Sequence, residues 1–231
     1  MTSVAIIAAM EEEITPLKGL LKDLEITVIA GFKYYTGYFS DKKIILLRSG
    51  IGKVNSTIST TLLLEKFKPD YVLNTGSAGA VDLSLKIGDL VISNKVCHHD
   101  VDITSFGYEK GQIPGLPTFF LPGNSLVKLA KEQLAILADT SYHFGLIVSG
   151  DRFVCTRDDV KKLKQIFPAV MACEMEAASV AQVCHIFNIP FLIIRAISDI
   201  PGENNAIDFK IFLQQAVKNY TDFLPKILYK I

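Results

Sequence analysis

Acidic side chains follow three apolar runs of the sequence, each at the point where a strand would end. These acids are the triplet 11–13 after the run 4–9, Glu174 and Glu176 after the run 168–173, and Asp199 after the run 190–198. In a mostly parallel sheet the carboxyl ends of the strands meet at one edge, where ligands bind. We therefore expect these carboxylates to converge on one cleft.

Carboxylates gathered in one cleft suit the cleavage of a bond whose transition state is cationic, as when a sugar loses its leaving group. One acid protonates the leaving group and a second accepts a proton from the attacking water. A third can accept hydrogen bonds from the sugar hydroxyls. An aromatic side chain such as Phe153 or Phe209 beside the cleft would stack on a planar leaving group. The pattern thus favours a glycosidic hydrolase.

Familiar cofactor and metal signatures fail in this sequence. The stretch RSGIGKVN at 48–55 resembles a nucleotide loop, but a Walker A loop needs Gly at Leu47 and Ser or Thr at Val54. The dinucleotide fingerprint needs Gly at Asn55. Neither HHD at 98–100 nor MACEMEAA at 171–178 has a recognised zinc spacing. We therefore predict that the protein uses no cofactor and no metal.

The composition restricts the classes of partner. Lys and Arg total 24 and Asp and Glu total 24, which removes the positive charge typical of proteins that bind nucleic acids or anionic membranes. No apolar stretch approaches the roughly 18 residues of a membrane span, and the first residues lack a basic signal region. The four cysteines form no C-x-x-C pair. We predict a cytoplasmic protein with reduced thiols and a small-molecule ligand.

Strand and helix patterns alternate along the chain. Strands are predicted at 4–9, 71–75, 89–97, 144–149, 168–173 and 190–198, with two or three more within 25–48. Helices are predicted at 11–24, 53–67, 124–138 and 157–167, then from the acids at 174–176 to 187, and as an amphipathic helix at 209–228. The segment 98–123 is too long for an idle connection. We predict one α/β domain over 1–231, with a mixed central sheet in a three-layer α/β/α arrangement.

Each candidate residue also has a structural explanation. The acids at 11–13 could serve only to complement the dipole of a helix N-terminus. Asp199 precedes Ile-Pro-Gly and could be a turn residue. Arg195 lies within an apolar strand and needs a partner, which a structural ion pair would supply. Met175 and the aromatic residues could be core.

Seven motifs resemble, in order and spacing, the bacterial 5'-methylthioadenosine/S-adenosylhomocysteine nucleosidase family. They are AAMEEEI, RSGIGKVN, NTGSAGA, DITSFGYEKGQIPG, GLIVSGDRF, CEMEAASVAQVCH and RAISD. The piece GSAG is shared across the purine nucleoside phosphorylase superfamily, whereas MEEE, SGIGK and EMEA together are specific to the nucleosidase branch. The resemblance covers essentially the whole chain. It implies a nucleoside phosphorylase-like fold, a homodimer, and irreversible hydrolysis of an adenine N-ribosidic bond.

The resemblance also implies roles for individual residues. Glu13 matches the base that activates water, and Asp199 matches the acid that protonates adenine at N7. Phe153 matches the residue that stacks on adenine, beside Ser198 and the backbone of Val154. The other matched residues are Glu176 and Met175 at the ribose, Ser77, Ala78 and Gly79 in the pocket lining, Glu174 and Arg195 as supports, Met10, Ile51 and Phe209 at the 5'-thio substituent, and Phe106 and Pro114 from the partner subunit.

Two alternative functions remain, and a few departures from the family lie near the site. Arg152 and the segment 155–157 differ from many relatives near the site, and this bears on substrate preference. The first alternative is a related enzyme, either a phosphorylase or a hydrolase of a futalosine-type nucleoside. The second belongs to another functional class and is a non-catalytic nucleoside-binding protein. The acids at 11–13 disfavour a phosphate nucleophile because they would repel it.

Overall fold

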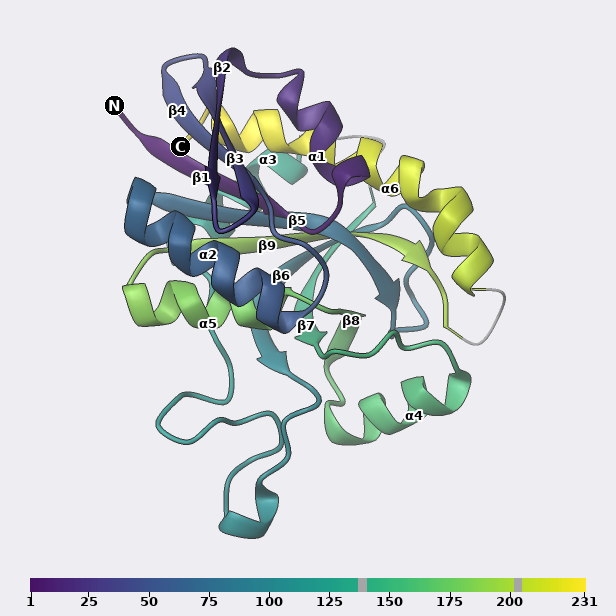
Figure 1. The fold of residues 1–231 in the computed structure, drawn as a ribbon. Helices are drawn as coiled ribbons and strands as arrows, with labels where there is room; N and C mark the ends of the chain where they lie inside the picture. Colours follow the sequence, from purple (N-terminus) through teal and green to yellow (C-terminus); the bar gives the residue numbers. More distant parts are fainter. Residues whose placement is uncertain (137–140, 202–204) are drawn as a thin grey trace.

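The computed structural model describes residues 1–136, 141–201 and 205–231, with the backbone alone described for 205–208 and 210. Strands and helices alternate along these ranges (Figure 1). The strands are β1 (Ser3–Ala8), β2 (Lys22–Ile29), β3 (Phe32–Phe39), β4 (Lys42–Arg48), β5 (Tyr71–Ala80), β6 (Leu90–His98), β7 (Tyr142–Ser149), β8 (Val170–Glu174) and β9 (Phe191–Asp199). The helices are α1 (Glu11–Lys18), α2 (Lys53–Phe67), α3 (Asn124–Leu134), α4 (Arg157–Ile166), α5 (Ala177–Phe187) and α6 (Asn205–Leu228), with a 3₁₀ turn at Thr104–Phe106.

A mixed sheet forms the centre of the fold, in the order β2-β3-β4-β1-β5-β8-β7-β6-β9. β1 runs parallel to β4 and β5, and β5 runs parallel to β9. The carboxyl ends of β1, β5 and β9 therefore reach the same edge of the sheet. β5 pairs with β8 as well as β9, which curls the second half of the sheet back on itself. The predicted mixed α/β fold is confirmed, whereas this closure was not predicted.

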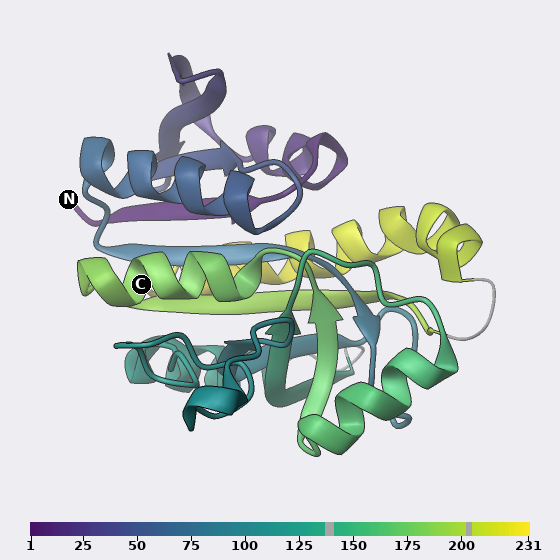
Figure 2. The same cartoon turned by 60° about the horizontal axis from the view of Figure 1, so that its bottom comes forward.

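Helices cover both faces of the sheet (Figure 2). α2 and α5 lie side by side on one face, where Leu63 and Ala181 belong to one buried cluster. α1, α3 and α6 cover the other face, where Ile14 and Leu224 belong to a second cluster. α4 packs through Leu163 on a third cluster near β7 and β8. The sheet is thus enclosed between two helical layers.

Several predicted boundaries differ from the structure, three of them at the following elements. The helix predicted at 11–24 is wrong beyond Lys18, because residues from Lys22 onward pair with β3 as part of β2. The strand predicted at 71–75 continues to Ala80, since its second half pairs with β8 and β9. The helix predicted at 124–138 ends at Leu134, and 137–138 lie outside the described residues.

Helix α2 forms although its threonines and Ile58 prefer strands. The hydroxyls of Thr57, Ser59 and Thr61 donate to backbone carbonyls four residues earlier, so they bond within the helix. The C-terminal helix α6 follows its predicted amphipathic pattern, with Tyr220 and Phe223 buried against the sheet. Among the helices that the structure describes, none has the length and apolarity needed to cross a membrane.

Candidate active site

A cavity of about 340 Å³ opens at the carboxyl ends of β1, β5, β8 and β9. Its volume falls in the range of small-molecule sites. The lining residues are Ala9, Met10, Glu13, Ile51, Thr75, Gly76, Ser77, Ala78, Gly79, Arg152, Phe153, Val154, Cys173, Glu174, Met175, Glu176, Arg195, Ser198, Asp199 and Phe209. Every residue predicted for the catalytic and substrate-binding sets of this chain is therefore at one cavity, including Glu13 and Asp199 from opposite ends of the sequence.

Glu13 is held by four donors although its side chain is almost fully buried. Its Oε2 accepts hydrogen bonds from the N–H of Ala9 at 2.9 Å and of Met10 at 3.1 Å. Its Oε1 accepts from the N–H of Ser77 at 3.0 Å and the Ser77 hydroxyl at 3.1 Å. Gly76 permits this approach, since a Cβ there would lie 2.9 Å from Glu13 Oε1. The end of β1 and the middle of β5 together fix the carboxylate.

Burial raises the pKa of Glu13 above the ordinary glutamate value. The N–H donors of Ser77 and Met10 and the positive charge of Arg195 act in the opposite direction. A carboxylate with a raised pKa is a stronger base than an exposed glutamate. Glu11 and Glu12, in contrast, are exposed, and Glu11 forms ion pairs with Lys18 and Arg48.

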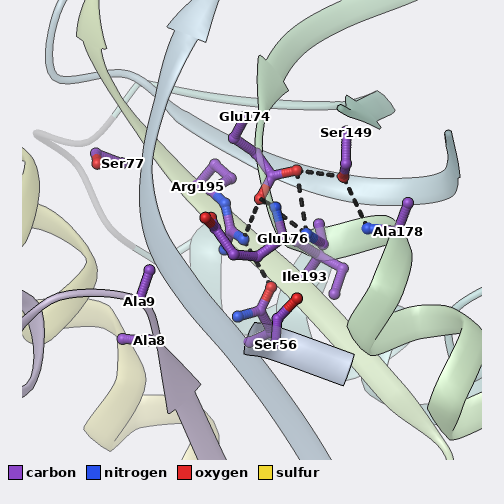
Figure 3. A network of polar contacts seen from close by, with 12 residues as sticks. Ala8, Ala9, Ser56, Ser77, Ser149, Glu174, Glu176, Ala178, Ile193 and Arg195 are labelled. Carbon is purple, nitrogen blue, oxygen red and sulfur yellow. Dashed lines mark hydrogen bonds and ion pairs between the residues drawn. The ribbon is translucent and has the colours of Figure 1, made fainter. Parts of the chain in front are cut away.

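Glu174 and Arg195 form a buried ion pair at the floor of the cavity (Figure 3). Arg195 Nη2 donates to Glu174 Oε2 and to Asn74 Oδ1, both at 2.7 Å. Glu174 also accepts from the N–H of Ala177, at the start of α5, and from the Ser149 hydroxyl. Arg195 is 2% exposed. The structural ion pair that the sequence left open for Arg195 is therefore present, and Glu174 lies where the α5 dipole favours an anion.

The Nε atom of Arg195 is buried and has no hydrogen-bond partner among the described residues. Glu176 lies beside it, and its Oε1 accepts from the N–H of Gly52 at 2.8 Å. Burial and the neighbouring Glu174 raise the pKa of Glu176 to about 8. This side chain can thus accept or donate a hydrogen bond near neutral pH.

Asp199 ends β9 and is 1% exposed. Its Oδ1 accepts from the Ser198 hydroxyl at 2.8 Å. A Cβ on Gly79 would lie 3.1 Å from Asp199 Oδ2 and 3.6 Å from Cys173 Sγ, so the glycine leaves room beside the carboxyl group. The strand end thus presents a confined carboxyl group to the cavity, which is the environment of a general acid.

Two aromatic rings form a wall of the cavity. Phe153 and Phe209 meet edge to face, with ring centroids 6.3 Å apart and an interplanar angle of 75°. Phe153 is 43% exposed, whereas the adjacent Val154 is buried against the cluster of α4. Arg152 also lines the cavity and pairs with Asp159 of α4 at 2.6 Å. The partly exposed ring of Phe153 offers a face on which a planar ligand can stack.

The two residues predicted to come from a partner subunit are not at the cavity. Phe106, in the long segment 98–123, is 80% exposed, and Pro114 is exposed as well. Five cavity residues were not predicted as site residues: Ala9, Thr75, Gly76, Arg152 and Cys173. Each lies within two residues of a predicted one, so extending each motif along its strand would have included them. Arg152 was singled out from the sequence only as a departure.

Residues outside the cavity account for the remaining polar motifs. Lys53 pairs with Asp100 at 2.6 Å, and His98 Nε2 lies 2.9 Å from Gln182 Oε1. Within the described ranges, no group of three His, Cys, Asp or Glu side chains could hold a metal ion. The polar side chains that line the cavity carry carboxylates, hydroxyls, guanidinium groups and the Cys173 thiol.

Comparisons with known proteins agree with this geometry. The family model described as "Phosphorylase superfamily" matches residues 3–228. The 5'-methylthioadenosine/S-adenosylhomocysteine nucleosidases of Hydrogenovibrio crunogenus and Bacillus pumilus are each 48% identical to this chain over 225 residues, which is 97% of each chain. Both similarities extend along nearly the entire sequence.

Solved structures are also similar to this chain over its whole length. The Neisseria meningitidis nucleosidase of that name, in complex with methylthio-immucillin-A, has a TM-score of 0.98 and 41% identity, with 100% of both chains covered. The Helicobacter pylori futalosine hydrolase has a TM-score of 0.95 and 36% identity, covering 100% of this chain and 98% of that one. The chain belongs to the phosphorylase superfamily and, within it, to the 5'-methylthioadenosine/S-adenosylhomocysteine nucleosidase family.

Proposed function

We propose that this protein hydrolyses the N-ribosidic bond of 5'-methylthioadenosine and S-adenosylhomocysteine, and of 5'-deoxyadenosine, to adenine and the 5-substituted ribose. The observation that carries the proposal is the presence of Glu13, Glu176 and Asp199 at one cavity, where Asp199 ends β9 and the two glutamates follow β1 and β8 in the chain. The relatives with the greatest similarity quoted above carry this activity in their names. The nucleosidase of Colwellia psychrerythraea, 41% identical with a TM-score of 0.96, was solved with adenine.

In the proposed reaction, Asp199 donates a proton to N7 of adenine while the bond between N9 and C1' of the ribose breaks. Glu13 accepts a proton from water as the water oxygen forms a bond to C1'. The developing positive charge on the ribose is stabilised by the surrounding carboxylates. Glu176 binds the ribose hydroxyls with Met175 packed on the sugar, and Phe153 stacks on adenine beside Val154 and Ser198. The 5'-thio substituent lies among Met10, Ile51 and Phe209.

Hydrolysis is favoured over phosphorolysis by the charges at the cavity. A phosphate nucleophile needs free cationic side chains or backbone N–H groups. The N–H groups of Ala9, Met10 and Ser77 already donate to Glu13, and the arginines that line the cavity, Arg195 and Arg152, are paired with Glu174 and Asp159. Bound phosphate would also lie close to the Glu13 carboxylate, which would repel it.

Product analysis tests the proposal. The protein is incubated with methylthioadenosine, with and without phosphate, and the products are separated. We expect adenine and free methylthioribose at the same rate in both conditions. Methylthioribose 1-phosphate formed only with phosphate would show a phosphorylase, and tight binding without turnover would show a binding protein. The same assay with a futalosine-type nucleoside tests the activity suggested by the Helicobacter pylori neighbour.

We also propose a homodimer in which Phe106 and Pro114 of each chain close the 5'-thio end of the other chain's cavity. The exposed apolar side chains of Phe106, and of Ile51 at the cavity rim, support this arrangement. Sedimentation analysis of the wild type tests the proposed dimer, and we expect a dimer. Steady-state kinetics of Phe106→Ser test the role of Phe106, and we expect a raised KM. A monomeric, fully active wild type would contradict it. The single-domain organisation and the cytoplasmic location stay predictions from the sequence.

A further inference from the structure

The C-terminal helix α6 contacts the candidate site in two places. Phe209, in its first turns, lines the cavity. Tyr220 follows eleven residues later, which is about three helical turns and returns it to the same face. Tyr220 is 0% exposed, and its hydroxyl donates to the backbone carbonyl of Glu13 at 3.1 Å. One face of one helix thus reaches both the aromatic wall and the chain segment that carries the proposed base.

The segment that carries Glu13 depends on such contacts for its position. α1 has only eight residues, and Pro16 inside it removes one backbone donor. A helix this short is not stable by itself, so tertiary packing must hold it. Ile14 and Leu17 pack in the same buried cluster as Tyr220. Apolar packing is non-directional, whereas the Tyr220 hydrogen bond fixes the Glu13 backbone at a definite atom.

We infer that Tyr220 is a positioning residue for catalysis, acting through the main chain of Glu13; the inference rests on the proposed role of Glu13 as the base. The four donors to the Glu13 carboxylate belong to β5 and to the two residues that link β1 to α1. These donors hold the carboxylate at the end of the Glu13 side chain, and Tyr220 holds the Glu13 backbone. Loss of the hydroxyl lets α1 shift relative to the sheet, which moves the carboxylate away from the reacting water.

The test compares two tyrosines in matched settings. Tyr34 is also 0% exposed, and its hydroxyl donates to the backbone carbonyl of Ser59 at 3.0 Å, outside the cavity lining. We expect Tyr220→Phe to lower kcat for methylthioadenosine by about tenfold with KM changed less than about twofold. Tyr34→Phe should lose a similar amount of thermal stability and keep the wild-type kcat.

Hydrogen exchange supplies a readout that does not depend on the substrate. Peptides that span residues 9–15 should exchange faster in Tyr220→Phe than in the wild type and in Tyr34→Phe. Equal exchange in all three proteins would overturn the inference even if the chain cleaved no nucleoside. An unchanged kcat, a rise in KM alone, or an equal loss of kcat in Tyr34→Phe would also overturn it. A wild type that cleaves no methylthioadenosine would refute the proposed function, and the exchange data would still decide whether Tyr220 positions this segment.

Discussion

Replacement of Glu13 by glutamine tests both the proposed base and the way in which the fold holds it. The carboxylate accepts two hydrogen bonds at Oε2, from Ala9 and Met10, and two at Oε1, from Ser77. Glutamine converts one of these acceptor positions into an NH₂ donor. At the Oε2 position the NH₂ group would face two N–H groups. At the Oε1 position the Ser77 hydroxyl can turn and accept, but the Ser77 N–H loses its acceptor.

At least one buried donor is therefore left unpaired in Glu13→Gln, which by itself costs about 1–3 kcal/mol of the free energy of unfolding, or roughly 2–12 °C in Tm. Removal of the buried charge, whose desolvation raises the pKa of Glu13, acts in the opposite direction. Removal of the general base should lower kcat by on the order of 10²-fold or more. Adenine release from methylthioadenosine measures kcat, and differential scanning fluorimetry measures Tm.

Glu12→Gln is the matched control, because Glu12 is the exposed neighbour in the same helix. We expect this variant to keep both the kcat and the Tm of the wild type. A Glu13→Gln variant that retained wild-type kcat would refute the assignment of Glu13 as the base. A Tm lowered by more than roughly 12 °C would refute the account of how the four donors hold the carboxylate.

Three further predictions concern the other charged groups of the site. Asp199→Asn should lower kcat for methylthioadenosine by on the order of 10²-fold or more, because the amide cannot protonate adenine; steady-state assays measure this, and a rate near wild type would contradict it. Since the pKa of Glu176 is raised from 4.5 to about 8, the folded state keeps a proton there that the unfolded chain has lost, and the stability from this group falls as pH rises through that interval. Glu176→Gln should accordingly be more stable than the wild type at about pH 9, with a difference that shrinks toward pH 4.5 in urea titrations; a constant difference would contradict the raised pKa. Arg195→Met removes the charge partner of the buried Glu174 and should cost about 3–5 kcal/mol in the free energy of unfolding, whereas a loss below about 1 kcal/mol would show that the N–H groups of α5 suffice.

Much of the fold could be predicted because apolar runs and helical periodicity are local properties of the chain. The run at 4–9 and the long apolar run at 190–198 correspond to β1 and β9. The helix predicted at 11–24 failed because strand pairing overrode a helical pattern: residues from Lys22 onward form hydrogen bonds with β3. Partner strands far along the sequence leave no mark on the local pattern, so such a boundary needs the tertiary structure.

The sequence by itself indicated which residues to propose for the chemistry and predicted that strand ends would bring them together. Acids after apolar runs are visible in the order of residues, and the family resemblance follows from motifs that contain them. Only the tertiary structure decided what surrounds each acid. Glu11 and Glu13 are two residues apart in one helix, yet the first pairs with Lys18 at the surface and the second is buried with four donors. The reason is physical: the charge state and basicity of a carboxyl group depend on burial and on donors that arrive from β5, 64 residues away.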